Sequence, residues 1–290
     1  MTACDAGSAN FLLPVIAGLD VPFALYAQDR AADIFARNKV PHERLERGDW
    51  EGLPALGDLV LSTGEYGAVL TGTSWGASVD KAATLAARKR GIPSVAIIEH
   101  WDLYRERFCR VEDGRITVPD AYLPDAVWLP DANAVDEAAK AGLPRARLNA
   151  VGQPHLEAQA ESLGKTDGAA RNQDIVFVSE RVAGDFHRGF TEHDALETLV
   201  SAMDFSRHRL VIKLHPQEEA DKYAYLAARG IKAAILKDCD LRPLLQRSHR
   251  IVGMFSMLLL EAALIRRDVI SLQPGGDPGI FVGNRNGATT

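Results

Sequence analysis

Short apolar runs alternate along the chain with longer stretches whose apolar residues recur at helical spacing. The stretches between the runs predict helices, and this alternation is the pattern of parallel sheets whose strands are joined by crossover helices. We therefore expect an α/β fold. The apolar runs predict strands at residues 23–26, 59–62, 68–71, 94–98, 126–129, 148–151, 175–178, 210–214, 233–236, 250–253 and 269–272.

Two of the expected helices have clear ends. The first begins at residue 80 and closes on Gly91, with Pro93 just beyond it and a buried strand after that. The second is short and stops near Gly142, and either Asp131 or Asn133 can cap its first turn. A helix with defined ends between two strands supports the crossover pattern.

The segment at 154–173 is polar and has few large apolar residues, which is typical of a domain boundary. It separates residues 1–153 from residues 174–290. Each part holds enough alternating strands and helices for one α/β domain. We expect an N-terminal Rossmann-like domain at 1–153, a linker at 154–173, and a C-terminal Rossmann-like domain at 174–290.

Groups that favour phosphate follow two of the expected strands in the C-terminal part. His215 and Pro216 end one strand, and Pro216 can open the next helix because its ring presets a helical φ. Ser256 stands at the start of a later helix, and Glu261 lies further along that helix. Ligands of open α/β sheets bind outside the carboxyl ends of strands, where helix N-termini present N–H groups. We expect His215 and Ser256 to hold phosphate and Glu261 to accept hydrogen bonds from ribose hydroxyls.

The N-terminal part offers two candidate bases. Asp5 lies in a turn of small residues with Gly7 and Ser8, where a ligand can approach the backbone and meet helix N–H groups. Glu99 and His100 directly follow a buried strand. They can form an acid/base pair or a structural hydrogen bond, and their place at a strand end favours the catalytic interpretation. We expect Asp5 or the Glu99/His100 pair to act as catalytic base. Gly7 and Ser8 are candidates for nucleotide or phosphate binding.

Composition narrows the class of protein. The 290 residues are 47% hydrophobic and 25% charged, as in a soluble globular chain. A formal charge of -6 disfavours nucleic acid and anionic membranes as partners. We therefore expect small anionic molecules as ligands.

The cysteines and the apolar runs also bear on where the protein works. Cys4, Cys109 and Cys239 lie far apart without the spacing of a zinc site or a disulfide framework. We expect no metal, no tightly bound cofactor and a cytoplasmic location. No apolar run approaches the roughly 20 residues of a membrane span, and Met1 is not followed by a signal peptide pattern. We therefore expect no integral membrane segment.

The order of several segments resembles a known architecture. Residues 72–108, 139–157, 212–216 and 253–272 follow one another as in the two-domain GT-B fold. The similarity is closest to the UDP-N-acetylglucosamine 2-epimerase type and to capsule and wall-polymer glycosyltransferases that share a His-Pro motif. In such enzymes the first domain ends with Gly-x-Pro, which Gly152 and Pro154 match. The resemblance implies a cleft between two Rossmann-like domains, with an acceptor on the first and a nucleotide sugar, UDP- or CMP/CDP-linked, on the second.

Three segments differ from the epimerase pattern. Glu99 is followed by His-Trp-Asp-Leu instead of Ala-Gly-Leu-Arg, residues 253–256 replace Asp-Ser-Gly-Gly, and residues 273–277 replace an Arg-rich segment. We therefore expect a nucleotide-sugar-dependent glycosyltransferase, or a related activated-polyol transferase, of surface or secondary carbohydrate biosynthesis. The alternatives are an epimerase or hydrolase of nucleotide sugars and a non-catalytic protein that binds them. The oligomeric state stays open, a homodimer included.

Overall fold

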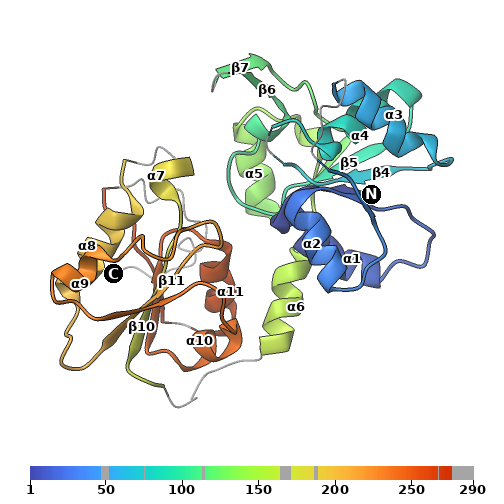
Figure 1. Ribbon diagram of the computed structural model, residues 1–290. Coiled ribbons are helices and arrows are strands. Elements are labelled where there is room, and N and C mark those ends of the chain that lie inside the picture. The colour runs from blue at the N-terminus through green and yellow to red at the C-terminus, as the bar shows by residue number, and fades with distance from the viewer. Residues whose placement is uncertain are drawn as a thin grey trace. The chain divides into compact units, whose positions relative to one another are not determined.

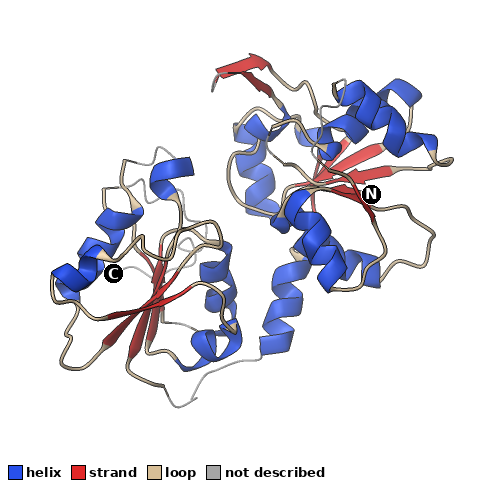
Figure 2. Cartoon of the chain, in the orientation of Figure 1, coloured by secondary structure: helices blue, strands red, loops and turns tan. Residues whose placement is uncertain are grey.

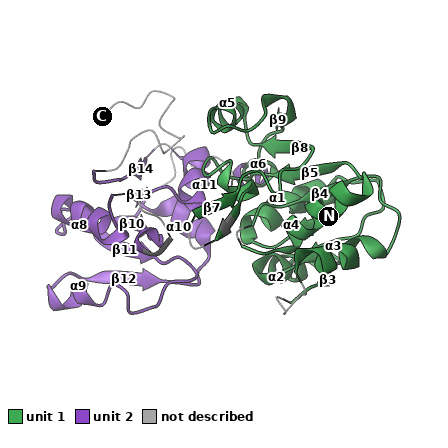
Figure 3. Cartoon of the chain, turned by 90° about the horizontal axis from the view of Figure 1, so that it is seen from above, with its two compact units in different colours: residues 1–157 green, residues 158–290 purple. Residues whose placement is uncertain are grey.

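A computed structural model describes residues 1–46, 52–74, 76–112, 115–163, 171–185, 189–266 and 268–275. The chain divides into two compact units, unit 1 at Met1–Glu157 and unit 2 at Ala158–Thr290 (Figure 3). The division falls within helix α6 (Pro154–Leu163), so the segment expected as a linker at 154–173 begins with a helix. Residues 164–170 of that segment lie outside the described residues.

Unit 1 is built on seven parallel strands in the order β3-β2-β1-β4-β5-β8-β9. They are β1 (Thr2–Ala3), β2 (Tyr26–Ala27), β3 (Glu43–Arg44), β4 (Val69–Thr71), β5 (Ser94–Ile97), β8 (Ala126–Leu129) and β9 (Leu148–Ala150). Figure 1 labels β4 and β5 of this sheet. The other elements are helices α1 (Ala6–Ala17), α2 (Asp29–Arg37), α3 (Leu53–Ser62), α4 (Val79–Arg90) and α5 (Ala132–Lys140), the 3-10 turns η1 (Glu106–Phe108) and η2 (Arg145–Arg147), and an antiparallel pair, β6 (Arg110–Glu112) and β7 (Arg115–Val118). The chain runs outward from β1 on one side and from β4 on the other, so β1 and β4 flank the switch point where ligands bind in sheets of this kind.

The helix ends of unit 1 follow the sequence signals. Ser78 caps α4 by accepting a hydrogen bond from the N–H of Lys81, and Gly91 ends the helix in the left-handed region at φ 67°. Asp131 is the residue that caps α5, by accepting from the N–H of Ala134. Local capping chemistry therefore fixes where the crossover helices begin and end.

The strand expected at 59–62 is wrong, because these residues form the end of helix α3. Leu56, Val60 and Leu61 of α3 are buried against α4, and Gly57 lies so close that an added Cβ would stand 2.5 Å from the carbonyl oxygen of Ala82. A short apolar run has no period of its own that separates strand from helix. Packing against α4 decides for the helix here.

Unit 2 is built on five parallel strands in the order β12-β11-β10-β13-β14. They are β10 (Asp174–Val178), β11 (Arg209–Lys213), β12 (Ala233–Leu236), β13 (Arg250–Gly253) and β14 (Val269–Ser271). Figure 2 draws the strands of this sheet in red, with blue helices on both sides. The helices are α7 (Val182–Asp185), α8 (Glu192–Ala202), α9 (Tyr225–Ala228), α10 (Leu241–Arg247) and α11 (Met257–Ile265). Here β10 and β13 flank the switch point.

Both faces of the unit 2 sheet are covered. Phe177 of β10 belongs to a core with Leu196 of α8, whereas its neighbour Val176 belongs to a core with Leu259 of α11. Successive side chains of a strand point to opposite faces, so a strand covered on both sides is apolar throughout. This explains why β10 is a continuous apolar run in the sequence.

The expectation that Pro216 opens a helix is wrong. A turn follows His215, and the next α-helix in the chain is α9. The carboxylate of Glu218 accepts the backbone N–H of His215 at 2.7 Å, so a side chain satisfies the backbone there. A proline at the right place permits a helix, but it does not require one.

Arg266, just after α11, is a buried cation that links three elements of unit 2. Its guanidinium donates to the carbonyl oxygens of Leu245 and Ser248, both at 2.7 Å, and it pairs with Asp268. Only 3% of Arg266 is exposed. Such a group holds the ends of α10 and α11 to the sheet.

We expect Arg266→Met to lower the free energy of unfolding of unit 2 by about 3–5 kcal/mol, because the substitution leaves buried carbonyls without their donor and removes one of the two cations that pair with Asp268. Urea unfolding of the purified chain measures this. Arg209→Met is the matched control, since Arg209 pairs with Asp174 at 2.7 Å with 67% of its side chain exposed, and such pairs contribute little. Equal losses for both variants would contradict the role given to Arg266.

Candidate functional site

Asp5 lies at the start of helix α1, next to the switch point of unit 1. Its Oδ1 accepts the N–H of Ser8 at 3.0 Å and the hydroxyl of Ser8 at 2.8 Å. Ser8 is fully buried and its hydroxyl also donates to the backbone of Asp5. The donors of Ser8 are therefore engaged by Asp5, and both residues stabilise the first turn of α1.

Gly7 and Glu99 come together although they are far apart in the sequence. Glu99 follows β5 and is 8% exposed. A Cβ built on Gly7 would stand 2.5 Å from Oε1 of Glu99 and 2.8 Å from its Cγ. Only glycine gives the carboxylate this space, so the backbone of α1 forms one wall of the Glu99 site.

The environment of Glu99 raises its pKa to about 7. Burial is the main cause, and the carboxylates of Asp5 and Asp80 act in the same direction. The guanidinium of Arg107, 3.8 Å away, opposes the shift. Oε2 of Glu99 is buried and has no hydrogen-bond partner among the described residues. A carboxyl group that titrates near neutral pH can take up or release a proton during a reaction.

Asp80 and Arg107 complete the site, and the sequence did not single out Asp80. Asp80 is 1% exposed and accepts hydrogen bonds from the hydroxyls of Thr2 and Ser74, each at 2.7 Å. Arg107 is 8% exposed and donates to the carbonyl and hydroxyl oxygens of Thr73 at 3.3 Å. Both residues line a small pocket of about 10 Å³. Asp80 lies in the first turn of α4, the helix that follows β4. This position could have marked it as a site residue, but in the sequence we used it only as the start of the helix.

His100 lies beside Trp101 at the edge of this site, with ring centroids 6.3 Å apart and planes at 66°. The indole N–H of Trp101 donates to Asp131 at 2.7 Å. Glu99 is thus held by Gly7 and Arg107, and His100 contacts the neighbouring aromatic ring. The two residues expected as a pair have different surroundings.

In unit 2, His215 lies in the turn after β11. Its Nδ1 accepts the backbone N–H of Gln217 at 3.2 Å. A ring nitrogen that accepts carries no proton, so this contact favours the neutral tautomer with the proton on Nε2. In that form Nε2 is the hydrogen-bond donor of His215.

Ser256 caps α11, as expected, by accepting the N–H of Leu258 at 3.1 Å. Glu261 lies half-buried on the same helix. The backbone N–H groups that lead into α11 do not point to solvent: those of Met254, Phe255 and Ser256 all donate to Oε1 of Glu180, at 3.1, 3.0 and 2.9 Å. Glu180 follows β10 and was not predicted from the sequence, although its place after an apolar strand could have marked it.

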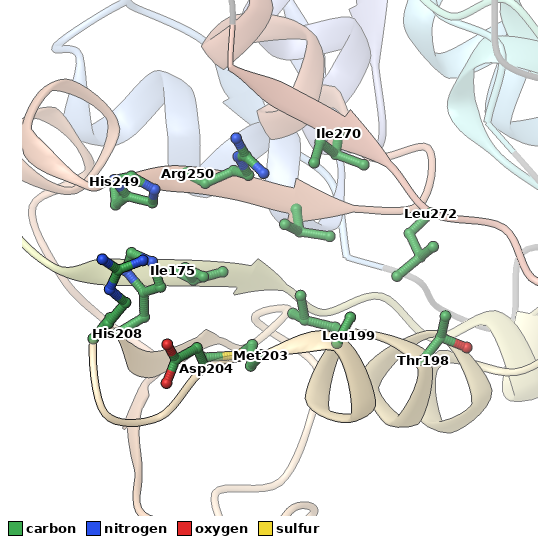
Figure 4. A pocket seen from close by; sticks show the side chains of 13 residues that line it. Ile175, Thr198, Leu199, Met203, Asp204, His208, His249, Arg250, Ile270 and Leu272 are labelled. Atoms are coloured by element: carbon green, nitrogen blue, oxygen red, sulfur yellow. The ribbon is translucent and has the colours of Figure 1, made fainter. Parts of the chain in front are cut away.

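A pocket of about 370 Å³ lies elsewhere in unit 2 (Figure 4). Its lining includes the rings of His208 and His249, stacked with centroids 4.4 Å apart, and Ile270. His208 and His249 immediately precede β11 and β13, at the amino ends of the strands. Ligands of open α/β sheets bind at the carboxyl ends, so this pocket is separate from the expected nucleotide site.

Over the described ranges, no cluster of three or more His, Cys, Asp or Glu side chains is suitably arranged for a metal ion. Within the same ranges, none of the helices has the length and apolar character needed to traverse a membrane.

The fold is similar to that of solved UDP-GlcNAc 2-epimerases and of HepE. UDP-GlcNAc 2-epimerase from Neisseria meningitidis bound to UDP-GlcNAc matches with TM-score 0.62 and 17% identity, over 89% of this chain and 77% of that one. The corresponding enzyme from Methanocaldococcus jannaschii matches with TM-score 0.60 and 12% identity, over 91% and 80%. HepE from Anabaena in complex with UDP-glucose matches with TM-score 0.58 and 10% identity, over 91% and 78%.

The expected fold class is confirmed by these likenesses: the chain has two Rossmann-like α/β units of the GT-B-like kind. A scan against protein-family models gives no match. A search of curated proteins gives none either. What the chain does with this fold must therefore be argued from its own residues.

We expect Gly7→Ala to displace the Glu99 side chain, because the new Cβ would overlap Oε1 and Cγ. Moving the carboxyl toward water would return its pKa toward the ordinary value, and titration of a carbon-labelled Glu side chain by NMR measures it. Gly18→Ala, at the other end of α1, is the control, since its Cβ would meet nothing closer than 3.8 Å. An unchanged Glu99 titration in Gly7→Ala would contradict the contact.

Proposed function

We propose that the protein is an enzyme of nucleotide-sugar chemistry in which unit 2 binds the nucleotide and Glu99 of unit 1 moves the proton. The observation that carries this proposal is Glu99, a buried carboxyl with a pKa near 7 at the ligand-binding end of the unit 1 sheet. The similar structures bound to UDP-GlcNAc and UDP-glucose support a UDP-sugar as the first ligand to test.

Transfer of the sugar to a hydroxyl is the leading reaction. The ionised Glu99 takes the proton of the acceptor hydroxyl, and the hydroxyl oxygen of the acceptor bonds to the anomeric carbon of the sugar. The bond from the anomeric carbon to the diphosphate breaks, and its electron pair leaves with the phosphate oxygen. Nε2–H of His215 and the backbone near Ser256 would receive the phosphates, and Glu261 the ribose hydroxyls. Asp5 is the alternative base.

Epimerisation is the second candidate, and the similarity to two UDP-GlcNAc 2-epimerases favours it. In that reaction a base removes the proton from C2 of the sugar while the bond from C1 to the diphosphate breaks, which leaves a double bond between C1 and C2. The diphosphate oxygen then adds back to C1 as C2 takes up a proton on the opposite face. Glu99 can serve as the base in either reaction, so its position does not separate them. The residues directly after Glu99 and those at 253–256 differ from the epimerase pattern, and these differences favour transfer.

Product analysis in deuterated water distinguishes the reactions. The purified chain is incubated with UDP-GlcNAc, UDP-glucose or a CMP- or CDP-linked substrate, with and without a hydroxyl acceptor. Acceptor-dependent release of nucleotide with a new glycoside supports transfer. Deuterium at C2 with inverted configuration indicates an epimerase, and nucleotide release without acceptor a hydrolase. Binding with no turnover of any substrate would contradict an enzyme and leave a binding protein.

We expect Glu99→Gln to lower turnover by roughly 10²–10⁴-fold with little change in nucleotide affinity, because proton transfer is needed only in the transition state. In the unaltered enzyme, turnover should rise with pH through about 7, since a base acts in its ionised form and the pKa of Glu99 is raised to that value. Steady-state rates from pH 5.5 to 8.5, with calorimetry of the nucleotide, measure both effects.

Glu106→Gln is the control for this experiment, since Glu106 lies in the nearby 3-10 turn and is half-exposed. Its rates and pH profile should match those of the unaltered enzyme. Full turnover in Glu99→Gln would show that Glu99 is not the base. The same rates would then be measured for Asp5→Asn, because Asp5 is the alternative base.

We expect His215→Ala to weaken nucleotide binding about tenfold with the fold intact, because a donor to phosphate is lost. Calorimetric titration with UDP measures the affinity, and circular dichroism checks the fold. His208→Ala is the control at the opposite end of the same strand. Unchanged UDP affinity in His215→Ala would remove this residue from the site.

A further inference from the structure

The loop between β13 and α11 forms a cradle for one negatively charged oxygen. The N–H groups of Met254, Phe255 and Ser256 converge on a single point, and the nine-residue helix α11 follows them. Successive amides that converge in this way bind anions, and the positive end of the helix dipole adds to the attraction. We call these three N–H groups the anion cradle.

The anion cradle is occupied by a carboxylate of the chain itself. Oε1 of Glu180 accepts all three N–H groups within 3.1 Å, and Glu180 is 7% exposed. Within the described part of the chain, no Lys or Arg forms a salt bridge with Glu180, so the amides are its main electrostatic partners. Burial and the nearby carboxylate of Glu218 raise the pKa of Glu180 to about 7, although the three N–H groups oppose the shift.

The position of Glu180 matters as much as its contacts. Glu180 follows β10 and the cradle follows β13, and these strands are neighbours at the switch point of the unit 2 sheet. This is where a ligand phosphate is expected. A phosphate oxygen and a carboxylate oxygen make the same kind of charge-assisted hydrogen bond to N–H groups, so both cannot occupy one cradle.

We propose that Glu180 is an internal stand-in for the ligand phosphate, which holds the anion cradle when no nucleotide is bound and leaves it when the phosphate enters. This inference rests on the proposed function, because it assumes that unit 2 receives a nucleotide diphosphate. Glu180 is then a residue that sets affinity. Only the fraction of molecules with an open cradle can bind phosphate, and the apparent affinity falls by that fraction.

The test compares two ligands, UDP and inorganic pyrophosphate, on the full chain and its Glu180→Gln and Glu180→Ala variants. Glu180→Ala should bind each ligand about 10- to 100-fold more tightly than the unaltered protein, the factor expected if the cradle is open in about 1–10% of molecules. Glu180→Gln should also bind each ligand more tightly, by a smaller factor, because its uncharged oxygen makes weaker hydrogen bonds to the amides than a carboxylate does. Glu180→Gln keeps a side-chain oxygen for the amides, so the test survives if Glu180→Ala fails to fold. Calorimetry gives the affinities, and NMR shows whether the amide resonances of residues 254–256 move with pyrophosphate.

Glu192→Gln is the matched control, because Glu192 is also a buried carboxylate of unit 2, accepting the N–H of Ala183 at 2.8 Å. Its ligand affinities should equal those of the unaltered protein.

The outcomes separate this inference from the proposed function. If the unaltered protein binds UDP and the Glu180 variants bind it no more tightly, Glu180 is a fixed part of the turn, and the inference is overturned while the proposed function stands. If UDP binds to none of the proteins but pyrophosphate binds the Glu180 variants with shifted amides at 254–256, the stand-in role holds and the nucleotide proposal fails. If neither ligand binds any variant, both fail.

Discussion

Buried and half-buried carboxylates beside the carboxyl ends of the strands are the constraint on which the rest of the structure depends. A carboxylate removed from water must find hydrogen-bond donors or take up a proton. Glu180 finds three backbone N–H groups, and Asp80 finds the hydroxyls of Thr2 and Ser74. The carboxylate of Asp5 accepts the N–H of Ser8 in the first turn of α1. The partners of Glu180 and Asp5 lie at the starts of helices, whereas Thr2 belongs to β1 and Ser74 to the loop between β4 and α4. Satisfying the carboxylates therefore also fixes how these segments join the sheet.

Glu99 is the exception, and the difference is informative. Its Oε2 has no donor among the described residues, and the nearest cation, Arg107, is at 3.8 Å. Holding such a group costs stability, and proteins accept that cost mainly where a proton must move. Gly7 enforces the arrangement, because any larger residue would push the carboxyl away. Oε1 of Glu180 accepts three backbone N–H groups, whereas Oε2 of Glu99 accepts no hydrogen bond from the described residues. This contrast supports different roles: one for holding an anion site, the other for chemistry.

The three compared structures match about nine-tenths of this chain, but their sequences are 17% identical to it or less. A similarity at this distance shows the fold alone and leaves the ligand and the reaction open. The reaction depends on a few side chains, and here these differ from the epimerase pattern directly after Glu99 and around the anion cradle. The carboxylate in the cradle would make this chain's affinity for a diphosphate depend on Glu180.

The sequence by itself determined the α/β class, most strand positions and the end of α4 at Gly91, and it narrowed the cap of α5 to Asp131 or Asn133, because these features depend on local apolar runs and on capping residues. It also marked Glu99, His215 and Ser256 as strand-end or helix-start groups. Tertiary structure alone decided that residues 59–62 are helical, since packing against α4 settles a run without its own period. Only the tertiary structure shows that Gly7 lies against Glu99 and that Glu180 accepts the amides of residues 254–256. Those contacts join segments that are distant in the chain, and no local pattern records which strands become neighbours.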